Sequence, residues 1–305
     1  MIELHAPGRR RSASRLYELL KRYEVRSVVD PFMGIPTHLN YLKRHGIATH
    51  GGDIVEWYVR AGEGIVVNDF TILRDSEVAE IVEMTPGRIY PTDMFRAWEG
   101  VFFSEEQCIY LGVWHDNVRN LRSDGQTGLA ILGLWYVLCY WLLKAHFPDE
   151  MQDIPPSDLA WNYIRQTERW VTQNLLRNTV RHGDGLGTIA AHNADALLFT
   201  PPNRNAYRTT DARVWMWEAW WHGNPYFNIE HYYRDSVFGA RTSDENSHSR
   251  AILSVLRAAE QYPVIVMPTN EAQVAHYEHL MKGVRDHVER LVFHPDEAYV
   301  IGTIN

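Results

Sequence analysis

The sequence predicts an α/β fold in which a sheet of mainly parallel strands is interrupted by a mostly helical insertion. Three observations lead to this prediction. Strand, turn, helix and strand patterns follow one another over residues 25–53. Helical periodicity then dominates residues 75–177, and the α/β alternation resumes afterwards. We therefore expect a sheet domain made of residues 1–74 and 178–305, with residues 75–177 as the insertion.

The first part of the sheet domain is predicted from the amphipathic stretch 13–23, which has leucines at helical spacing. A buried strand over residues 25–29 should end in the turn 30–34, followed by a helix through Leu42. A second strand over residues 46–50 should close at 51–53.

The insertion carries three long helical patterns, over residues 104–121, 129–145 and 157–176, with prolines marking a break between the last two. The apolar run 129–143 is shorter than the roughly 18 residues expected of a membrane-spanning helix. A buried helix is therefore expected there, and no membrane partner.

The last part of the chain returns to alternating patterns. An extended segment closes at residues 181–184, and a strand over 194–199 runs into the segment 200–203. A helix over 249–261 leads into a buried strand over 263–267, and residues 291–293 and 298–301 predict a closing hairpin.

The composition limits the function classes without choosing one. The formal net charge of -8 weighs against a protein whose main task is gripping DNA, although local basic patches matter more than the sum. Two cysteines cannot build a disulfide framework or a zinc site alone, and the N-terminus lacks an apolar signal segment. A reduced, cytoplasmic setting is expected.

Two acidic positions and two turns are candidates for ligand binding. Gly34 ends the first strand turn, where a glycine lets backbone approach a ligand, and Asp53 ends the second strand, where an acidic residue can bind ribose hydroxyls. Asp184 lies in the glycine-rich segment 183–187 and could accept a hydrogen bond from a cofactor amine. Each candidate has a structural alternative. The segment with Gly34 could be an ordinary strand–helix turn, Asp53 could be a helix N-cap, and residues 183–187 could be a flexible turn.

The segment Thr200-Pro201-Pro202-Asn203 follows an apolar strand directly. Two prolines fix the backbone there, so that the carbonyls have set directions, which suits recognition of an amine. The alternative is a turn that only ends the strand.

Other clusters favour structure over chemistry. His276 and His279 have helical spacing near glutamates, but no third-ligand motif accompanies them, so exposed helix histidines are expected and no metal site. The tryptophans at 215, 217, 220 and 221 predict core or a wall of a substrate pocket.

Taken in order, these segments resemble the alpha group of adenine-specific DNA methyltransferases. Residues 7–11 resemble the family's N-terminal basic glycine motif, 30–34 its cofactor loop, and 102–106 a phrase of one bacterial and archaeal branch. Residues 200–203 occupy the position of the family's catalytic motif, and residues 264–270 resemble the strand that follows this motif. The resemblance implies a Rossmann-like methyltransferase sheet whose insertion, residues 75–177, is a possible target-recognition region.

The resemblance also implies the ligand and the site residues. S-adenosyl-L-methionine is the expected cofactor, held by Asp30, Phe32, Gly34, Thr37, Asp53 and Asp184. The expected partner is DNA, contacted by Arg9, Arg10, Arg11 and Arg204, with Arg15 and Arg208 as further candidates. The expected reaction is methyl transfer to the exocyclic amine of adenine by Thr200, Pro201, Pro202 and Asn203.

Two departures from the family pattern bear on activity. Pro36 stands where the cofactor loop has a second glycine, which removes a backbone donor and fixes φ. Thr200 replaces an acidic or amide residue, and Asn203 replaces an aromatic that stacks on the flipped base, a role that Tyr207 could take over. A catalytically degenerate fold that binds DNA or a protein is therefore the alternative, and methylation of RNA or another base a third.

Overall fold

The computed structural model describes residues 7–143, 154–202, 212–230, 234, 236–239 and 244–304. The chain is an α/β protein with a seven-stranded mixed sheet, compatible with a Rossmann-like fold, which confirms the predicted α/β class. Asn203, Arg204, Tyr207 and Arg208 lie outside the described residues, as do the side chains of residues 9–11.

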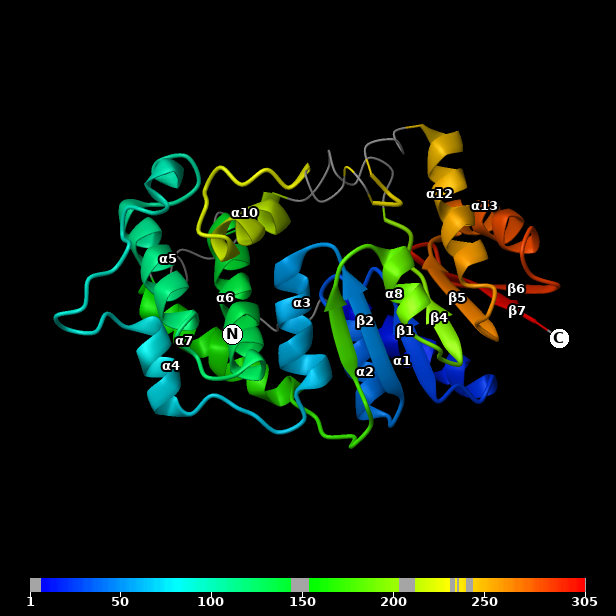
Figure 1. Ribbon diagram of the computed structural model, residues 1–305, viewed down its shortest axis with the longest axis horizontal. Helices are drawn as coiled ribbons and strands as arrows, with labels where there is room; N and C mark the ends of the chain where they lie inside the picture. The colour runs from blue at the N-terminus through cyan, green and yellow to red at the C-terminus, as the bar shows by residue number, and fades with distance from the viewer. Residues whose placement is uncertain are drawn as a thin grey trace. The chain divides into compact units, whose positions relative to one another are not determined.

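The sheet has the order β3-β2-β1-β4-β5-β7-β6 (Figure 1). The first five strands are parallel, and β7 runs antiparallel to both β5 and β6. Their bounds are β1 Ser27–Asp30, β2 Ala48–Asp53, β3 Thr179–His182, β4 Ala196–Leu198, β5 Val264–Thr269, β6 His287–His294 and β7 Glu297–Thr303. The predicted closing hairpin is confirmed, and both of its strands are longer than expected.

Helices cover both faces of the sheet, which explains why its central strands are almost entirely apolar. Helices α1 (Pro7–Arg22) and α2 (Thr37–Arg44) lie on one face, and α8 (Gly185–Ala191), α12 (Glu245–Ala258) and α13 (Glu271–Lys282) on the other (Figure 1). Val28, Leu197 and Ile265 are fully buried between them. Helix α1 begins several residues before the predicted stretch, within the arginine-rich segment.

The second strand differs from its prediction. Gly51, Gly52 and Asp53 belong to β2 and do not follow it, because they pair with β1 on one side and β3 on the other. Asp53 is thus the last residue of β2, at the carboxyl edge of the sheet.

The chain divides into two compact units. The sheet unit comprises residues 1–59, 173–209 and 230–305, and the helical unit residues 60–172 and 210–229. The helical unit thus begins earlier than residue 75 and includes a later segment. The reason for the early start is that α3 (Glu56–Gly62) continues into a π-helix, Glu63–Val67, whose Ile65 and Val66 are buried.

The helical unit contains α4 (Asp75–Val82), α5 (Glu105–Val118), α6 (Asp124–Leu143), α7 (Pro156–Thr167) and α10 (Ala212–Trp221). Ser104 is the N-cap of α5: its hydroxyl accepts from the Gln107 amide, while the Gln107 side chain accepts from the Ser104 amide. This capping box gives part of the segment 102–106 a structural role. Helix α7 ends well before residue 176.

Helix α6 forms the core of the helical unit. Among the described residues it is the one helix long and apolar enough to cross a membrane, yet 67% of its most apolar window is buried inside the protein. Trp217 and Trp220 of α10 are fully buried and stack with ring centroids 4.1 Å apart. The tryptophan cluster is therefore mainly core, as one of the two sequence interpretations expected.

Candidate functional site

A cavity of about 340 Å³ opens at the carboxyl ends of β1, β2 and β4. Most of the predicted cofactor-binding and catalytic residues line it, namely Phe32, Gly34, Asp53, Asp184 and residues 200–202. Apolar side chains of Ile54, Val55 and Phe238 complete much of its wall. Its size and its mixed lining are those of a small-ligand site at the carboxyl edge of a parallel sheet.

Asp53 joins the loop after β1 to the end of β2. Its Oδ2 accepts a hydrogen bond from the Gly34 amide at 2.9 Å, and its Oδ1 accepts from the Val55 amide at 2.9 Å. Gly34 has a φ of +52°, a left-handed conformation that glycine adopts without steric cost. The carboxylate of Asp53 thereby fixes the shape of the cavity floor, and the residue is only 8% exposed.

Asp30 does not line the cavity, contrary to its predicted role as a direct cofactor ligand. It is buried beneath the loop, where its carboxyl accepts from the Phe32 amide at 3.1 Å. Burial, together with the nearby charge of Asp53, raises the pKa of Asp30 to about 7. Its role is to hold the backbone that presents Phe32.

Thr37 is also absent from the cavity lining, contrary to prediction. It is the first residue of α2, and its amide donates to the Ile35 carbonyl at 2.7 Å. Pro36 precedes it with a φ of -77°, close to the value that proline favours. The proline therefore turns the chain directly into the helix, and Thr37 lies outside the cavity.

An Asp30→Asn variant tests the pKa of this buried carboxyl. Because the folded pKa of about 7 exceeds the unfolded value of about 3.9, Asp30 contributes stability that is complete below about pH 4 and lost as pH rises through about 7. Asparagine keeps the acceptor for the Phe32 amide but cannot ionise. The difference in unfolding free energy should therefore shift in favour of the variant by about 4 kcal/mol between about pH 4 and pH 7, whereas the cost of burying an extra amide donor, about 1–3 kcal/mol, is the same at every pH.

Urea unfolding at a series of pH values measures this gain. A constant difference in unfolding free energy between the two proteins across the whole series would contradict the raised pKa.

Asp184, another residue of the cavity wall, is held by two backbone amides. Its Oδ2 accepts from the Leu186 amide at 3.1 Å as the N-cap of α8, and its Oδ1 accepts from the Val237 amide at 3.1 Å. The residue after it must be glycine, since a Cβ on Gly185 would lie 2.3 Å from the Phe32 ring. Asp184 is thus the N-cap of α8, a role that was not predicted for it from the sequence, and the same side chain also lines the cavity.

The predicted catalytic segment leaves the sheet at the end of β4. Thr200 is exposed at the cavity rim, and Pro201 behind it is buried. The Pro202 carbonyl accepts a hydrogen bond from Nε2 of the buried His248 at 2.8 Å, which fixes the proton on that nitrogen. Sequence reasoning missed His248, because nothing local links α12 to the segment that it holds.

Three phenylalanine rings pack together beside the start of this segment. The rings of Phe32 and Phe199 have centroids 5.5 Å apart, and Phe238 meets Phe32 edge-on at 5.3 Å. These contacts join the loop after β1 to the end of β4. Phe238 was also missed, since it lies in a segment without a recognisable pattern.

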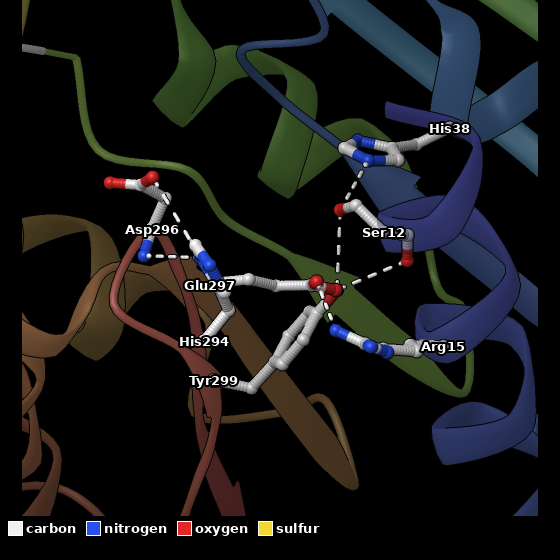
Figure 2. A network of polar contacts seen from close by, with 7 residues as sticks. All are labelled: Ser12, Arg15, His38, His294, Asp296, Glu297 and Tyr299. Atoms are coloured by element: carbon white, nitrogen blue, oxygen red, sulfur yellow. Dashed lines mark hydrogen bonds and ion pairs between the residues drawn. The ribbon is translucent and has the colours of Figure 1, made fainter. Parts of the chain in front are cut away.

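A second cavity, of about 610 Å³, lies on the other side of Thr200 and Pro201, which line both. Side chains from α1, α2, the end of β5 and the β6–β7 turn form its walls. Figure 2 shows its polar network, in which the Tyr299 hydroxyl lies 3.0 Å from a Glu297 carboxylate oxygen and 3.2 Å from the Ser12 hydroxyl. Ser12 in turn lies 3.3 Å from Nε2 of His38.

Arg15 is engaged in this network. It pairs with Glu297, and its guanidinium lies over the Phe293 ring at 4.9 Å from the centroid. The arginine therefore joins α1 to the closing hairpin, and the DNA contact expected of it stays a prediction. Tyr299 is almost completely buried, and burial is the main cause that raises its pKa well above the usual range.

The predicted helix histidines lie on α13, where His276 Nε2 is 3.1 Å from the Ser249 hydroxyl. In the described part of the chain, no group of three or more metal-ligating side chains comes together.

No protein-family model matches the sequence, and no curated protein matches it either.

Proposed function

We propose that this protein transfers a methyl group from S-adenosyl-L-methionine to the exocyclic amine of adenine in DNA. One observation carries the proposal: two cavities of the sheet unit share the wall formed by Thr200 and Pro201. A group-transfer enzyme needs a donor and an acceptor compartment that meet at the reacting atoms. The segment at this junction is the one that resembles the catalytic motif.

The first cavity suits the donor. Asp53 and Asp184 place two carboxylates on its wall, suited to ribose hydroxyls and an adenine amine respectively, and Phe32, Ile54 and Val55 offer apolar surface for a base. S-adenosyl-L-methionine, when bound, supplies an electrophilic methyl group. Among the predicted cofactor residues, Asp30 and Thr37 would act through the loop and not by contact.

The second cavity suits the acceptor. Tyr277, Phe293 and Tyr299 contribute aromatic surface, while Asn270 and Gln273 contribute amides of the kind that hydrogen-bond base edges. The Thr200 hydroxyl and the Pro201 carbonyl would accept hydrogen bonds from the amine, orienting its lone pair. The hydrogen bond from His248 to the Pro202 carbonyl stiffens the segment that carries Thr200 and Pro201.

The sheet is compatible with the proposal. Its five parallel strands agree with the Rossmann-like sheet that the resemblance implies, and the antiparallel strand β7 belongs to the closing hairpin that the sequence predicts.

A second candidate function is that of a catalytically degenerate methyltransferase fold that binds DNA or a protein. Thr200 favours it, because a hydroxyl stands where the family carries an acidic or amide group. Asn203 favours it as well, because it stands where the family carries an aromatic residue that stacks on the flipped base. Asn203 lies outside the described residues.

The experiment that tests the proposal combines binding and turnover. Calorimetry should detect S-adenosyl-L-methionine binding by the purified protein. Incubation with labelled cofactor and mixed-sequence DNA, followed by digestion to nucleosides and mass analysis, should yield methyladenine. Binding without any methylated product would favour the degenerate fold, and methylated RNA or another base would identify the third alternative. Absence of binding would contradict both the cofactor and the enzyme assignment.

A further inference from the structure

We propose that the helical unit carries a phosphate-binding site, formed by Arg60, Arg119 and Arg122 beside Trp221. The site lies in a cavity of about 480 Å³ that none of the sheet-unit residues line. The assignment of a phosphate ligand stands on this cavity alone. Naming DNA as the source of the phosphate rests on the proposed function.

Trp221 organises two of the three arginines. The guanidinium of Arg119 lies 5.0 Å from its ring centroid and that of Arg60 lies 5.5 Å away, both within cation–π range. The indole side chain belongs to a residue only 9% exposed, so little of its face is open for stacking on a base. The ring therefore acts as a platform for arginines, and the ligand they recognise is an anion.

Arg119 is oriented before any ligand binds. Its Nε donates to Nε2 of His115 at 3.0 Å, and its terminal nitrogen donates to the Trp221 carbonyl. Burial, with the charge of Arg119, lowers the pKa of His115 to about 4, so His115 is neutral near neutral pH. Both partners hold the guanidinium without cancelling its charge.

The charge balance of the cavity favours an anion. Arg60 pairs with Glu63 at 3.0 Å and with the exposed Asp124 at 3.6 Å. Arg119 donates to a ring nitrogen and to a backbone carbonyl. Among the described residues, neither Arg119 nor Arg122 forms an ion pair with a carboxylate, and Arg122 is exposed. In a chain of net charge -8, this concentration of positive charge runs against the overall balance.

Hydroxyl groups complete the chemistry of a phosphate site. Ser123 and Thr127, at the start of the 20-residue helix α6, line the same cavity as the arginines. Arginine recognises phosphate oxygens through paired N–H donors, and hydroxyls add further donors. Asp124 is the acidic lining residue, and its charge opposes an anion.

The test uses the 305-residue chain without S-adenosyl-L-methionine. Binding of a labelled short DNA duplex and of inorganic phosphate is measured for wild type, Arg122→Gln and Asp124→Asn. Arg96→Gln is the matched control, since Arg96 is an exposed arginine of the same unit that does not line the cavity.

For a DNA phosphate, Arg122→Gln should weaken duplex binding roughly three- to tenfold at fixed salt and reduce the salt slope by about 1. Asp124→Asn should tighten binding, and Arg96→Gln should match wild type. If only inorganic phosphate binding responds, the source is a free phosphate group and the site still stands. Equal binding of both probes by all four proteins, or binding of neither probe by wild type, would overturn it. Because no cofactor is present, a failed methylation assay does not affect this result.

Discussion

An Asp53→Ala variant should bind S-adenosyl-L-methionine roughly tenfold to a hundredfold more weakly than wild type. A charged acceptor of ligand hydroxyls contributes about 1.5–3 kcal/mol. The same change also leaves the amides of Gly34 and Val55 without the carboxylate that accepts from them, so the loop after β1 loses its anchor. Both effects act on the same cavity, which places the expected loss near the upper end.

Calorimetry on matched variants separates ligand binding from general destabilisation. Asp195 is the control, because its carboxylate accepts from the amides of Arg26 and Ser27 at the opposite edge of the sheet. Asp195→Ala should lower the free energy of unfolding but leave cofactor affinity near that of wild type. If the two alanine variants bind the cofactor equally well, Asp53 is a structural carboxylate only.

The double variant Thr200→Asp with Asn203→Tyr should raise the rate of adenine methylation by about a hundredfold or more. Replacing a hydroxyl acceptor by a carboxylate should recover roughly 1.5–3 kcal/mol, and restored stacking on a flipped base about 1–3 kcal/mol. At about 1.4 kcal/mol per tenfold, these gains combine to roughly two to four orders of magnitude if all of them act on the transition state.

Mass analysis of nucleosides from methylated DNA measures this rate. A Thr200→Val variant with Asn203→Tyr removes the side-chain acceptor while keeping the aromatic, and should remain slow. Wild-type activity as fast as that of an ordinary methyltransferase, falling in the Asp/Tyr double variant, would show that Thr200 serves another substrate.

Local patterns were sufficient for many of the elements. The strands around Val28, Leu197 and Ile265 are apolar because both faces of a parallel sheet are covered, and this leaves a readable run in the sequence. The helices α12 and α13 have regular spacing of buried residues. The predicted boundaries of some other elements were less accurate, as at β2 and α7. Capping residues and strand pairing decide where an element ends, and the sequence pattern alone does not show them.

The candidate site was predicted in part. Strand ends gave Asp53, Asp184 and residues 200–202 correctly as neighbours, since the carboxyl ends of parallel strands meet at one edge. Asp30 and Thr37 flank the same turn, yet Asp30 at the end of β1 is directed inward, whereas Thr37 begins helix α2. Sequence spacing cannot distinguish these directions.

The sequence by itself determined the α/β class, the helical insertion and the strand ends that carry polar groups, because hydrophobic periodicity and turn residues are local properties. Only the tertiary structure decided that His248 holds the Pro202 carbonyl, that Arg15 is bound to Glu297, and that Trp221 gathers two arginines. Each of these contacts joins segments far apart along the chain. Their geometry depends on how whole elements pack, and no local pattern encodes it.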